Sequence, residues 1–274
     1  MKFNLVYFSS TGNSAYLAEK AKEQIETAGH EVQIFEAITA NLDEVFQCDI
    51  IGLHFPIWGS EAAKPMRWFL KKMGESGKSA KVYMISDCAK MPGNGTHFEA
   101  RQLSKLSGGK IKTFYTQNVK MPCNFNIGIF NLHQSQELVA QIVEKSTSEL
   151  HTYIAEILSG KESIEKGNPL LKPLFPLIRN IEPIFLKKLA RKLNSDPEKC
   201  IRCRMCVKIC PVENITLNPE TNCIEYSDKC IFCLKCYNFC PKAAINVGGE
   251  TPNTEKYARY KGHEKRPRVN MYRK

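Results

Sequence analysis

The sequence contains no uninterrupted apolar run of the length that a membrane-spanning helix needs. Its first residues, Met1 to Phe8, read as a β-strand with no cleavage site behind them, so we expect a cytoplasmic protein without an export signal. The six histidines are scattered, and none stands in a pattern typical of a Cys–His or His–Asp nucleophile set. We therefore assign no catalytic residue.

Three motifs of cofactor-dependent enzymes are also missing. The absence of G-x-x-x-x-G-K-[ST] disfavours an ATPase or GTPase, and no G-x-G-x-x-G follows a predicted strand to support direct use of NAD(P)H. A radical-SAM activase would need C-x3-C-x2-C. Cys206 and Cys210 have the first interval, but no cysteine follows at the second.

Cysteine, by contrast, is abundant, and most of the twelve cysteines stand in two identical C-x2-C-x2-C-x3-C-P runs, which end at Pro211 and Pro241. The run is typical of bacterial ferredoxins, in which the first three cysteines bind one [4Fe–4S] cluster and the fourth binds the other. The spacing therefore predicts two sets of ligands. They are Cys200, Cys203, Cys206 and Cys240 for one cluster, and Cys230, Cys233, Cys236 and Cys210 for the second.

Two other uses of these cysteines fit the sequence less well. Structural zinc sites usually combine two spaced pairs of ligands, often with histidine, and no histidine lies in or beside either run. Disulfides are typical of secreted chains with a signal peptide. The cysteine usage instead favours a reducing cytoplasm.

The first 158 residues alternate between strand and helix patterns. We expect strands at 2–8, 31–35, 49–55, 81–86 and 110–119, and helices at 13–28, 64–73, 98–106 and 134–158. Alternation of this kind predicts an α/β fold with a doubly wound, five-stranded parallel sheet. Ligands of such sheets bind beyond the carboxyl ends of the strands.

A hydroxyl-rich loop follows the first predicted strand and leads directly into a helix. Hydroxyl groups and free backbone N–H groups at a helix N-terminus form an anion site, and glycine lets the backbone approach a phosphate closely. An ordinary N-cap is the alternative, but a cap needs only one such residue. The candidate anion-binding residues are Ser9, Ser10, Thr11, Gly12, Asn13 and Ser14.

The stretch from Val6 to Ser14 resembles the FMN phosphate loop of flavodoxins, and together with the cysteine runs the chain resembles flavodoxin–ferredoxin fusion proteins, or ferrodoxins, of anaerobic bacteria and archaea. The resemblance implies one FMN and two [4Fe–4S] clusters. It also implies a flavodoxin-like domain at 1–158 and a basic, proline-rich helical linker at 159–194. A small α+β bacterial ferredoxin-like domain would follow at 195–248, with a basic tail at 249–274.

The same resemblance implies that three further loops contact the flavin ring, with Trp58 stacking on it. The alternatives are a Trp58 packed in the core and an ordinary turn begun by Pro122. The predicted ring contacts are Pro56, Ile57, Trp58 and Gly59 after the third strand, Asp87, Cys88, Gly93, Asn94 and Gly95 after the fourth, and Asn124 after the fifth.

Basic residues are concentrated in the linker and the tail. The formal charge is +11, which two clusters and a flavin phosphate would lower to about +5. In the linker, four prolines are expected to break the chain into short pieces whose apolar side bridges two domains, and a membrane-surface helix is the alternative. For the tail we expect a solvated, extended arm, with docking of an acidic partner as the alternative.

These features predict an electron-transfer protein that couples the two-electron chemistry of FMN to one-electron clusters. The partner would be another redox protein, such as an acidic ferredoxin or an oxidoreductase, and nothing calls for nucleic acid. The alternative is an FMN-dependent reductase of a small organic substrate, such as a quinone or nitro compound, that is fed by its own clusters.

Overall fold

The computed structural model describes residues 1–90, 93–127, 134–167, 173–249, 251–260 and 262. Its contacts divide the chain into two compact units. The first unit comprises Met1–Ser9, Asn13–Pro122 and Val139–Arg179, and the second comprises Ser10–Gly12, Cys123–Leu138 and Asn180–Lys274. Two short stretches of the N-terminal half, Ser10–Gly12 and Cys123–Leu138, therefore belong with the C-terminal half.

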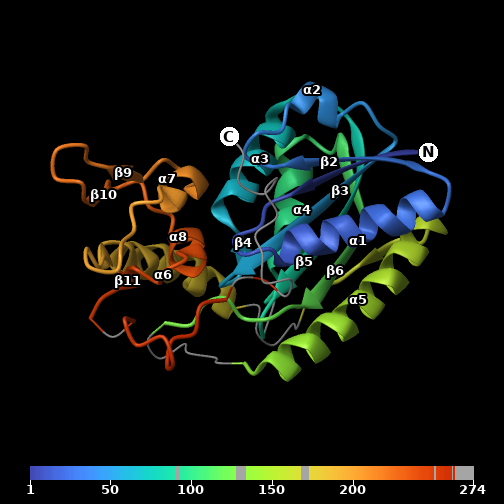
Figure 1. The fold of residues 1–274 in the computed structure, drawn as a ribbon. Helices are drawn as coiled ribbons and strands as arrows, with labels where there is room; N and C mark the ends of the chain where they lie inside the picture. Colours follow the sequence, from blue (N-terminus) through green and yellow to red (C-terminus); the bar gives the residue numbers. More distant parts are fainter. Residues whose placement is uncertain (91–92, 128–133, 168–172, 250, 261, 263–274) are drawn as a thin grey trace. The chain divides into compact units, whose positions relative to one another are not determined.

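The first unit is built on a mostly parallel sheet (Figure 1). Its long strands are β1 (Lys2–Tyr7), β2 (Glu31–Glu36), β3 (Ile50–Trp58), β5 (Ala80–Cys88) and β6 (Ile111–Lys120), in the order β2-β1-β3-β5-β6. This is the flavodoxin-like doubly wound order, so the predicted fold class is confirmed. Two short strands are additional: β4 (Glu61–Ala62) pairs antiparallel with β3, and β7 (Ser163–Ile164) pairs with β6.

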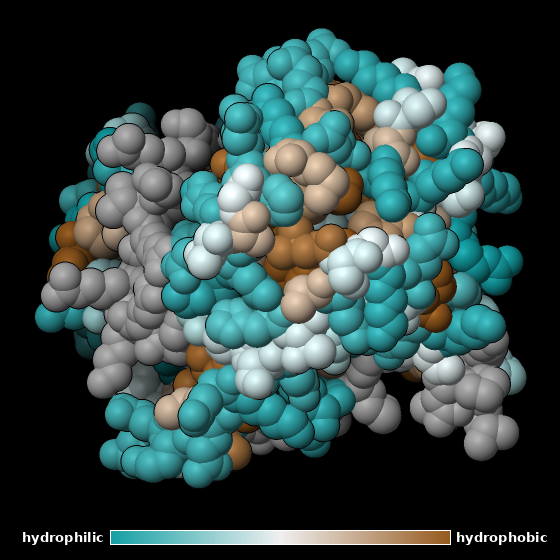
Figure 2. Space-filling view, turned by 90° about the vertical axis from the view of Figure 1, so that its right-hand side faces the viewer, coloured by the Kyte–Doolittle hydropathy of each residue, from teal (hydrophilic) through white to brown (hydrophobic). Residues whose placement is uncertain are grey.

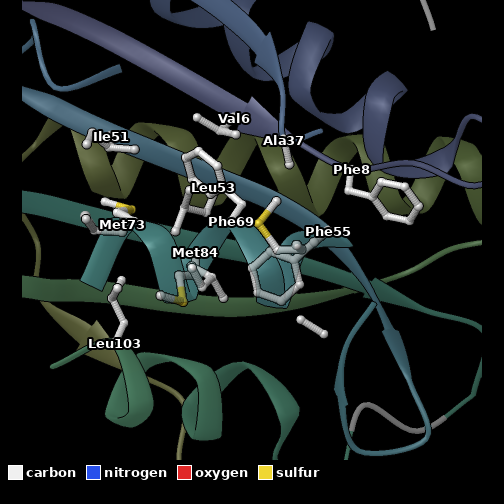
Figure 3. Close-up of a cluster of buried hydrophobic side chains, with 14 of the residues drawn as sticks. Val6, Phe8, Ala37, Ile51, Leu53, Phe55, Phe69, Met73, Met84 and Leu103 are labelled. Atoms are coloured by element: carbon white, nitrogen blue, oxygen red, sulfur yellow. The ribbon is translucent and has the colours of Figure 1, made fainter. Parts of the chain in front are cut away.

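Helices cover both faces of this sheet. Helices α1 (Asn13–Thr27) and α5 (Gln136–Leu158) enclose one hydrophobic core, and α3 (Lys64–Glu75) and α4 (Gly95–Leu106) enclose the other. A short helix, α2 (Leu42–Val45), was not predicted. Figure 3 shows Leu53, Phe69 and Met84 gathered in the second core. Burial of each such side chain contributes about 1.5–3 kcal/mol.

The second unit contains two similar halves. Each half has a cysteine loop and a short helix, α7 (Met205–Ile209) or α8 (Lys235–Phe239), followed by a strand. Strands β9 (Ile215–Leu217) and β10 (Ile224–Tyr226) form the predicted hairpin, while β8 (Leu193–Ser195) pairs antiparallel with β11 (Ile245–Val247). Among the described residues, no helix is long and apolar enough to cross a membrane.

The prolines do not break the linker as predicted. Helix α6 is continuous from Leu174 to Ala190, with Pro183 in its interior. Pro176 stands in the first turn, where the missing N–H has no helical partner in any case, and Pro183 alone removes an internal hydrogen bond. Two of the four linker prolines are thus compatible with one helix, and Pro169 lies outside the described residues.

The tail is not an extended, solvated arm over the part that is described. Thr251 and Tyr257 are each 1% exposed, and Tyr260 is 9% exposed. The sequence shows few apolar residues here, but two tyrosines have enough apolar area to anchor the segment in the second unit. Residues 263–274, which include most of the basic tail residues, lie outside the described part.

Candidate functional site

Two small cavities collect the cysteines of the two runs. The first cavity is lined by Cys200, Cys203, Cys206 and Cys240, and the second by Cys210, Cys230, Cys233 and Cys236. These are the sets that the spacing predicts, with the fourth cysteine of each run lining the cavity of the other. Their role as cluster ligands remains a prediction.

Left-handed backbone turns shape both cysteine loops. Arg202 and Arg204, which flank Cys203, have φ angles of 57° and 58°, and the equivalent residues Phe232 and Leu234 have 57° and 60°. Non-glycine residues rarely adopt this conformation, which costs roughly 1–2 kcal/mol at each position. Two such residues within three positions turn the chain sharply around Cys203 and around Cys233.

Backbone N–H groups point at several of the sulfur atoms. The donor–acceptor distances are 3.2 Å from Asn214 N to Cys210 Sγ, 3.2 Å from Ala244 N to Cys240 Sγ and 3.3 Å from Phe232 N to Cys230 Sγ. Hydrogen bonds to the sulfurs stabilise thiolate charge and help to set a cluster's potential. The first two bonds are equivalent in the two halves, as expected for two sites of one kind.

The arrangement suits a cluster better than a single ion. In the described part of the chain, no group of three or more His, Cys, Asp or Glu side chains is placed to hold one metal ion. Zinc ligands converge to about 2.3 Å from the metal, whereas these sulfurs surround a cavity. Burial raises the pKa of the Cys206 thiol to about 11 and that of Cys233 to about 12, so cluster binding, which needs thiolates, releases protons.

The two cavities differ in exposure. Around the first, Cys203 is exposed, Ile201 is 56% exposed and Met205 is 36% exposed. Around the second, Phe232 and Leu234 are each only 4% exposed. The residues that flank the first cysteine loop are therefore more exposed than those that flank the second.

Segments that are distant in the sequence pack against the second cysteine loop and α8. The Phe125 and Phe232 rings meet edge to face at 5.8 Å, and the Tyr237 hydroxyl donates to Asn126 O at 3.3 Å. From the tail, the Arg259 guanidinium lies 3.4 Å from the Tyr237 ring centre and donates to Ile245 O at 3.0 Å. Burial lowers the pKa of Arg259 to about 10, so it is a cation at neutral pH.

The hydroxyl-rich loop leads into α1 as predicted. All of its non-glycine residues are 5% exposed or less, and Gly12 has a φ of 111°, which only glycine adopts readily. Among the described residues, the buried Ser10 Oγ has no hydrogen-bond partner. An uncompensated buried hydroxyl at the start of a 15-residue helix fits an anion site.

Asn124 connects this loop to helix α8 within the second unit. Its Nδ2 donates to Thr11 Oγ1 at 2.8 Å, and its carbonyl accepts from Asn238 Nδ2 at 3.2 Å. Asn238 is fully buried and also accepts from Tyr260 N at 2.9 Å. Because Thr11 Oγ1 is the acceptor of the Asn124 bond, its own proton is not used there and can serve an anion.

Within the first unit, a buried carboxyl group lies against the first turn of α1. Ser14 Oγ donates to Asp87 Oδ1, and burial raises the pKa of Asp87 to about 7, an increase that the Ser14 bond partly opposes. Asp87 therefore loses most of its negative charge as the pH falls below 7.

Replacing Asp87 with asparagine is expected to flatten the pH dependence of stability. Unfolded Asp87 releases its proton near pH 3.8 and the folded residue near pH 7, so its contribution to the free energy of unfolding falls as pH rises through this window. The Asp87→Asn protein should gain about 2 kcal/mol relative to the original between pH 5.5 and 8. Thermal unfolding midpoints across this range provide the measurement.

Ser14→Ala should change the pH dependence of stability in the opposite direction, because it raises the pKa of Asp87 further. It removes the hydrogen bond that favours the Asp87 carboxylate, so the fall in stability should extend to higher pH. Parallel pH profiles for the original protein and both variants would show that Asp87 does not titrate in this window.

The predicted ring contacts after the third strand lie mainly in regular structure. Strand β3 continues through Trp58, and Gly59, with a φ of 58°, begins the turn to β4. Trp58 is partly buried against the core and meets Phe8 edge to face at 6.1 Å. The structure thus gives Trp58 a packing role, and its stacking on a flavin ring remains a prediction.

The next predicted ring loop is also shorter than expected. Asp87 and Cys88 end β5, and Gly95 begins α4 after its N-cap, Asn94. Asn94 Oδ1 accepts from Arg179 Nη2 of α6 at 2.7 Å, and a Cβ on Gly93 would lie 3.1 Å from the Phe175 ring. Both residues therefore lie against α6, a contact that no pattern in the sequence predicts.

Comparison with known proteins supports an iron–sulfur domain. Residues 192–241 match the family model described as a 4Fe-4S dicluster domain. No curated protein matches the chain. The iron–sulfur character that the cysteine spacing predicts is thereby confirmed for the C-terminal part, and the match is consistent with a role in electron transfer.

Solved flavodoxin structures are similar to the N-terminal part. The flavodoxin of Megasphaera elsdenii is 19% identical, with 56% of this chain and 98% of that chain covered and a TM-score of 0.42. Flavodoxin 1 of Bacillus cereus is 13% identical, with 58% and 98% covered and a TM-score of 0.42. A flavodoxin mutant from Pseudomonas aeruginosa is 14% identical, with 58% and 97% covered and a TM-score of 0.43. These identities are too low to indicate a shared ligand.

Proposed function

We propose that the protein is an electron carrier in which FMN and two [4Fe–4S] clusters form one redox chain. The observation that carries the proposal is the hydrogen-bonded connection from Thr11 through Asn124 to Asn238. Asn238 stands on α8 between Cys236 and Cys240, which line different cavities. When bound, FMN exchanges one or two electrons and each cluster exchanges one.

The residues of the chain have distinct parts in this proposal. Ser10, Thr11 and the backbone around Gly12 bind the FMN phosphate, and the eight motif cysteines hold the clusters. The exposed rim of the first cavity, with Arg202 and Arg204, meets a redox partner of acidic surface. The second cluster, held by Cys210, Cys230, Cys233 and Cys236, would pass electrons between the first cluster and the flavin.

The proposal is tested on protein purified without oxygen. We expect iron, sulfide and flavin contents that correspond to two clusters and one FMN per chain. After reduction, the flavin should be reoxidised rapidly by a small redox protein and slowly by a panel of quinones, nitro compounds and disulfides. Fast multiple turnovers with one small molecule would indicate a reductase instead, and clearly lower cofactor contents would contradict both functions.

Asn124→Ala is expected to weaken FMN binding about ten-fold. The change removes the bond that orients the Thr11 hydroxyl, and one hydrogen bond to a charged group is worth about 1.5–3 kcal/mol. Riboflavin lacks the phosphate, so its affinity should change little. Fluorescence titration with both ligands gives the comparison.

Asn126→Ala is the matched control, because Asn126 is a buried neighbour that donates to Ala258 O rather than to the loop. Equal losses of FMN and riboflavin affinity in Asn124→Ala would indicate general disturbance of the segment rather than loss of a phosphate contact.

A further inference from the structure

Helix α6 has one face that is packed. At 100° per residue, Phe175, Arg179, Leu186 and Leu189 fall on the same side of the helix. Phe175 is 5% exposed, and Arg179 donates to Ser60 O at 3.2 Å. Leu186 and Leu189 pack against the core of the second unit. The side chains on this side of α6 are therefore packed or hydrogen-bonded.

The opposite side of α6 carries a row of large apolar residues that we call the exposed stripe. Its members are between 38% and 61% exposed and fall within about 120° of helical arc. They are Leu174, Leu177, Ile178, Ile181, Ile184 and Phe185. Single exposed apolar residues are normal, but a continuous row of this kind marks an interaction surface.

Basic residues accompany the stripe. Lys187, Lys188, Arg191 and Lys192 are exposed at the C-terminal end of α6 and just after it. Between positions 166 and 195 the sequence contains one acid, Glu182, which is half-buried and falls on the packed side of the helix. The face of the molecule drawn in Figure 2 is hydrophilic around its edges and has a smaller apolar patch near its centre. The stripe thus combines apolar area with an excess of positive charge in the same segment.

We propose that the exposed stripe of α6 docks the protein on an anionic lipid surface. The helix would lie in the plane of the interface, with its leucine, isoleucine and phenylalanine side chains between the headgroups and the acyl chains. Lys187, Lys188, Arg191 and Lys192 would contact the negative headgroups. Such docking places an electron carrier at a membrane without a spanning segment, and it goes beyond the function proposed above.

The chemistry of the stripe favours lipid over protein. Its members present roughly 500 Å² of area, so two copies would bury at most about 1,000 Å², less than the 1,200–2,000 Å² of stable interfaces. Protein interfaces also contain about one hydrogen bond per 100–200 Å², and none of the six side chains can form one. A lipid surface requires only apolar area and positive charge.

The test is sedimentation of the cofactor-loaded full chain with vesicles. We expect binding to phosphatidylcholine vesicles that contain a quarter phosphatidylglycerol, and much weaker binding to phosphatidylcholine alone. Ile181→Ser combined with Ile184→Ser should lower the partition coefficient at least ten-fold. Lys187→Glu combined with Lys188→Glu should lower it for anionic vesicles only. Circular dichroism and iron content verify that the variants fold.

Two matched controls exclude general effects. Leu138→Ser removes a leucine of α5 that is 43% exposed, and Lys71→Glu with Lys72→Glu makes the same charge change on exposed residues of α3. Both should bind vesicles like the original protein. The proposal is overturned by an original protein that does not bind anionic vesicles or by controls that lose as much binding. A concentration-dependent dimer that the Ile181→Ser, Ile184→Ser variant abolishes would also overturn it, because a second copy would then cover the stripe.

Discussion

Replacing Cys236 with alanine is expected to remove about half of the iron and sulfide, because one of two [4Fe–4S] clusters loses a ligand. Cys236 is 8% exposed and lines the second cavity. The remaining cluster should show an isolated EPR signal on reduction, without the magnetic coupling of a pair. Iron analysis and EPR spectroscopy of protein prepared without oxygen provide the measurement.

The same experiment tests which of the two clusters each cysteine binds. Cys210 belongs to the first run in sequence but lines the second cavity, so Cys210→Ala should retain the same cluster as Cys236→Ala and give the same spectrum. Cys203→Ala should retain the other, buried cluster, and the two groups of variants should differ in their rate of iron loss to a chelator. Cys223, which is exposed and lines neither cavity, provides the control, since Cys223→Ala should keep all its iron.

A spectrum of Cys210→Ala that matches Cys203→Ala would mean that each run holds its own cluster. That result would contradict the crossed arrangement of the two cavities. Full iron content in Cys236→Ala would remove Cys236 from the proposed ligands altogether.

Replacing Gly12 with alanine is expected to weaken FMN binding at least about 100-fold. An alanine disfavours the φ of 111° at this position, so the backbone N–H groups of the loop would turn away from the phosphate. Loss of two hydrogen bonds to a charged group corresponds to several kcal/mol. Titration with FMN and with riboflavin should show the loss for FMN only.

Gly29→Ala separates backbone strain from ligand binding. Gly29 also has a positive φ, 83°, but an added Cβ would meet nothing within 4 Å and the residue lies outside the loop. Gly29→Ala should lower the free energy of unfolding by about 1 kcal/mol, as is also expected for Gly12→Ala. It should leave the affinity for FMN unchanged. Equal affinity losses in both variants would show that the loop binds no phosphate.

Much of the fold follows from patterns that act over short distances along the chain. The periodicity of Leu17, Ala21 and Ile25 places one face of α1 in the core, and Pro65 suits the first turn of α3. The cysteine spacing likewise predicts both cavity linings, because a tight loop with two intervening residues leaves few ways to point three thiols at one centre. These features can be predicted from residues that are close together in the sequence.

Errors at strand ends have a different origin. The sequence places Trp58 and Asp87 in loops, but pairing extends β3 and β5 through them. Strand length depends on the partner strands, and β3 is lengthened further by β4, which pairs with it through Ile57 and Trp58. A glycine or proline in the sequence indicates a turn only where the backbone does not form hydrogen bonds with a neighbouring strand.

By itself, the sequence determined the doubly wound sheet, the buried hydroxyl-rich loop that leads into α1 and the grouping of the cysteines into two sets. Only the tertiary structure decided that Asn124 joins Thr11 to Asn238, that Arg259 packs on the Tyr237 ring, and that residues flanking the first cysteine loop are more exposed than those flanking the second. The physical reason is the separation of the partners: Asn124 and Asn238 stand 114 positions apart. Contacts of that range depend on how whole elements pack, and no local pattern records them.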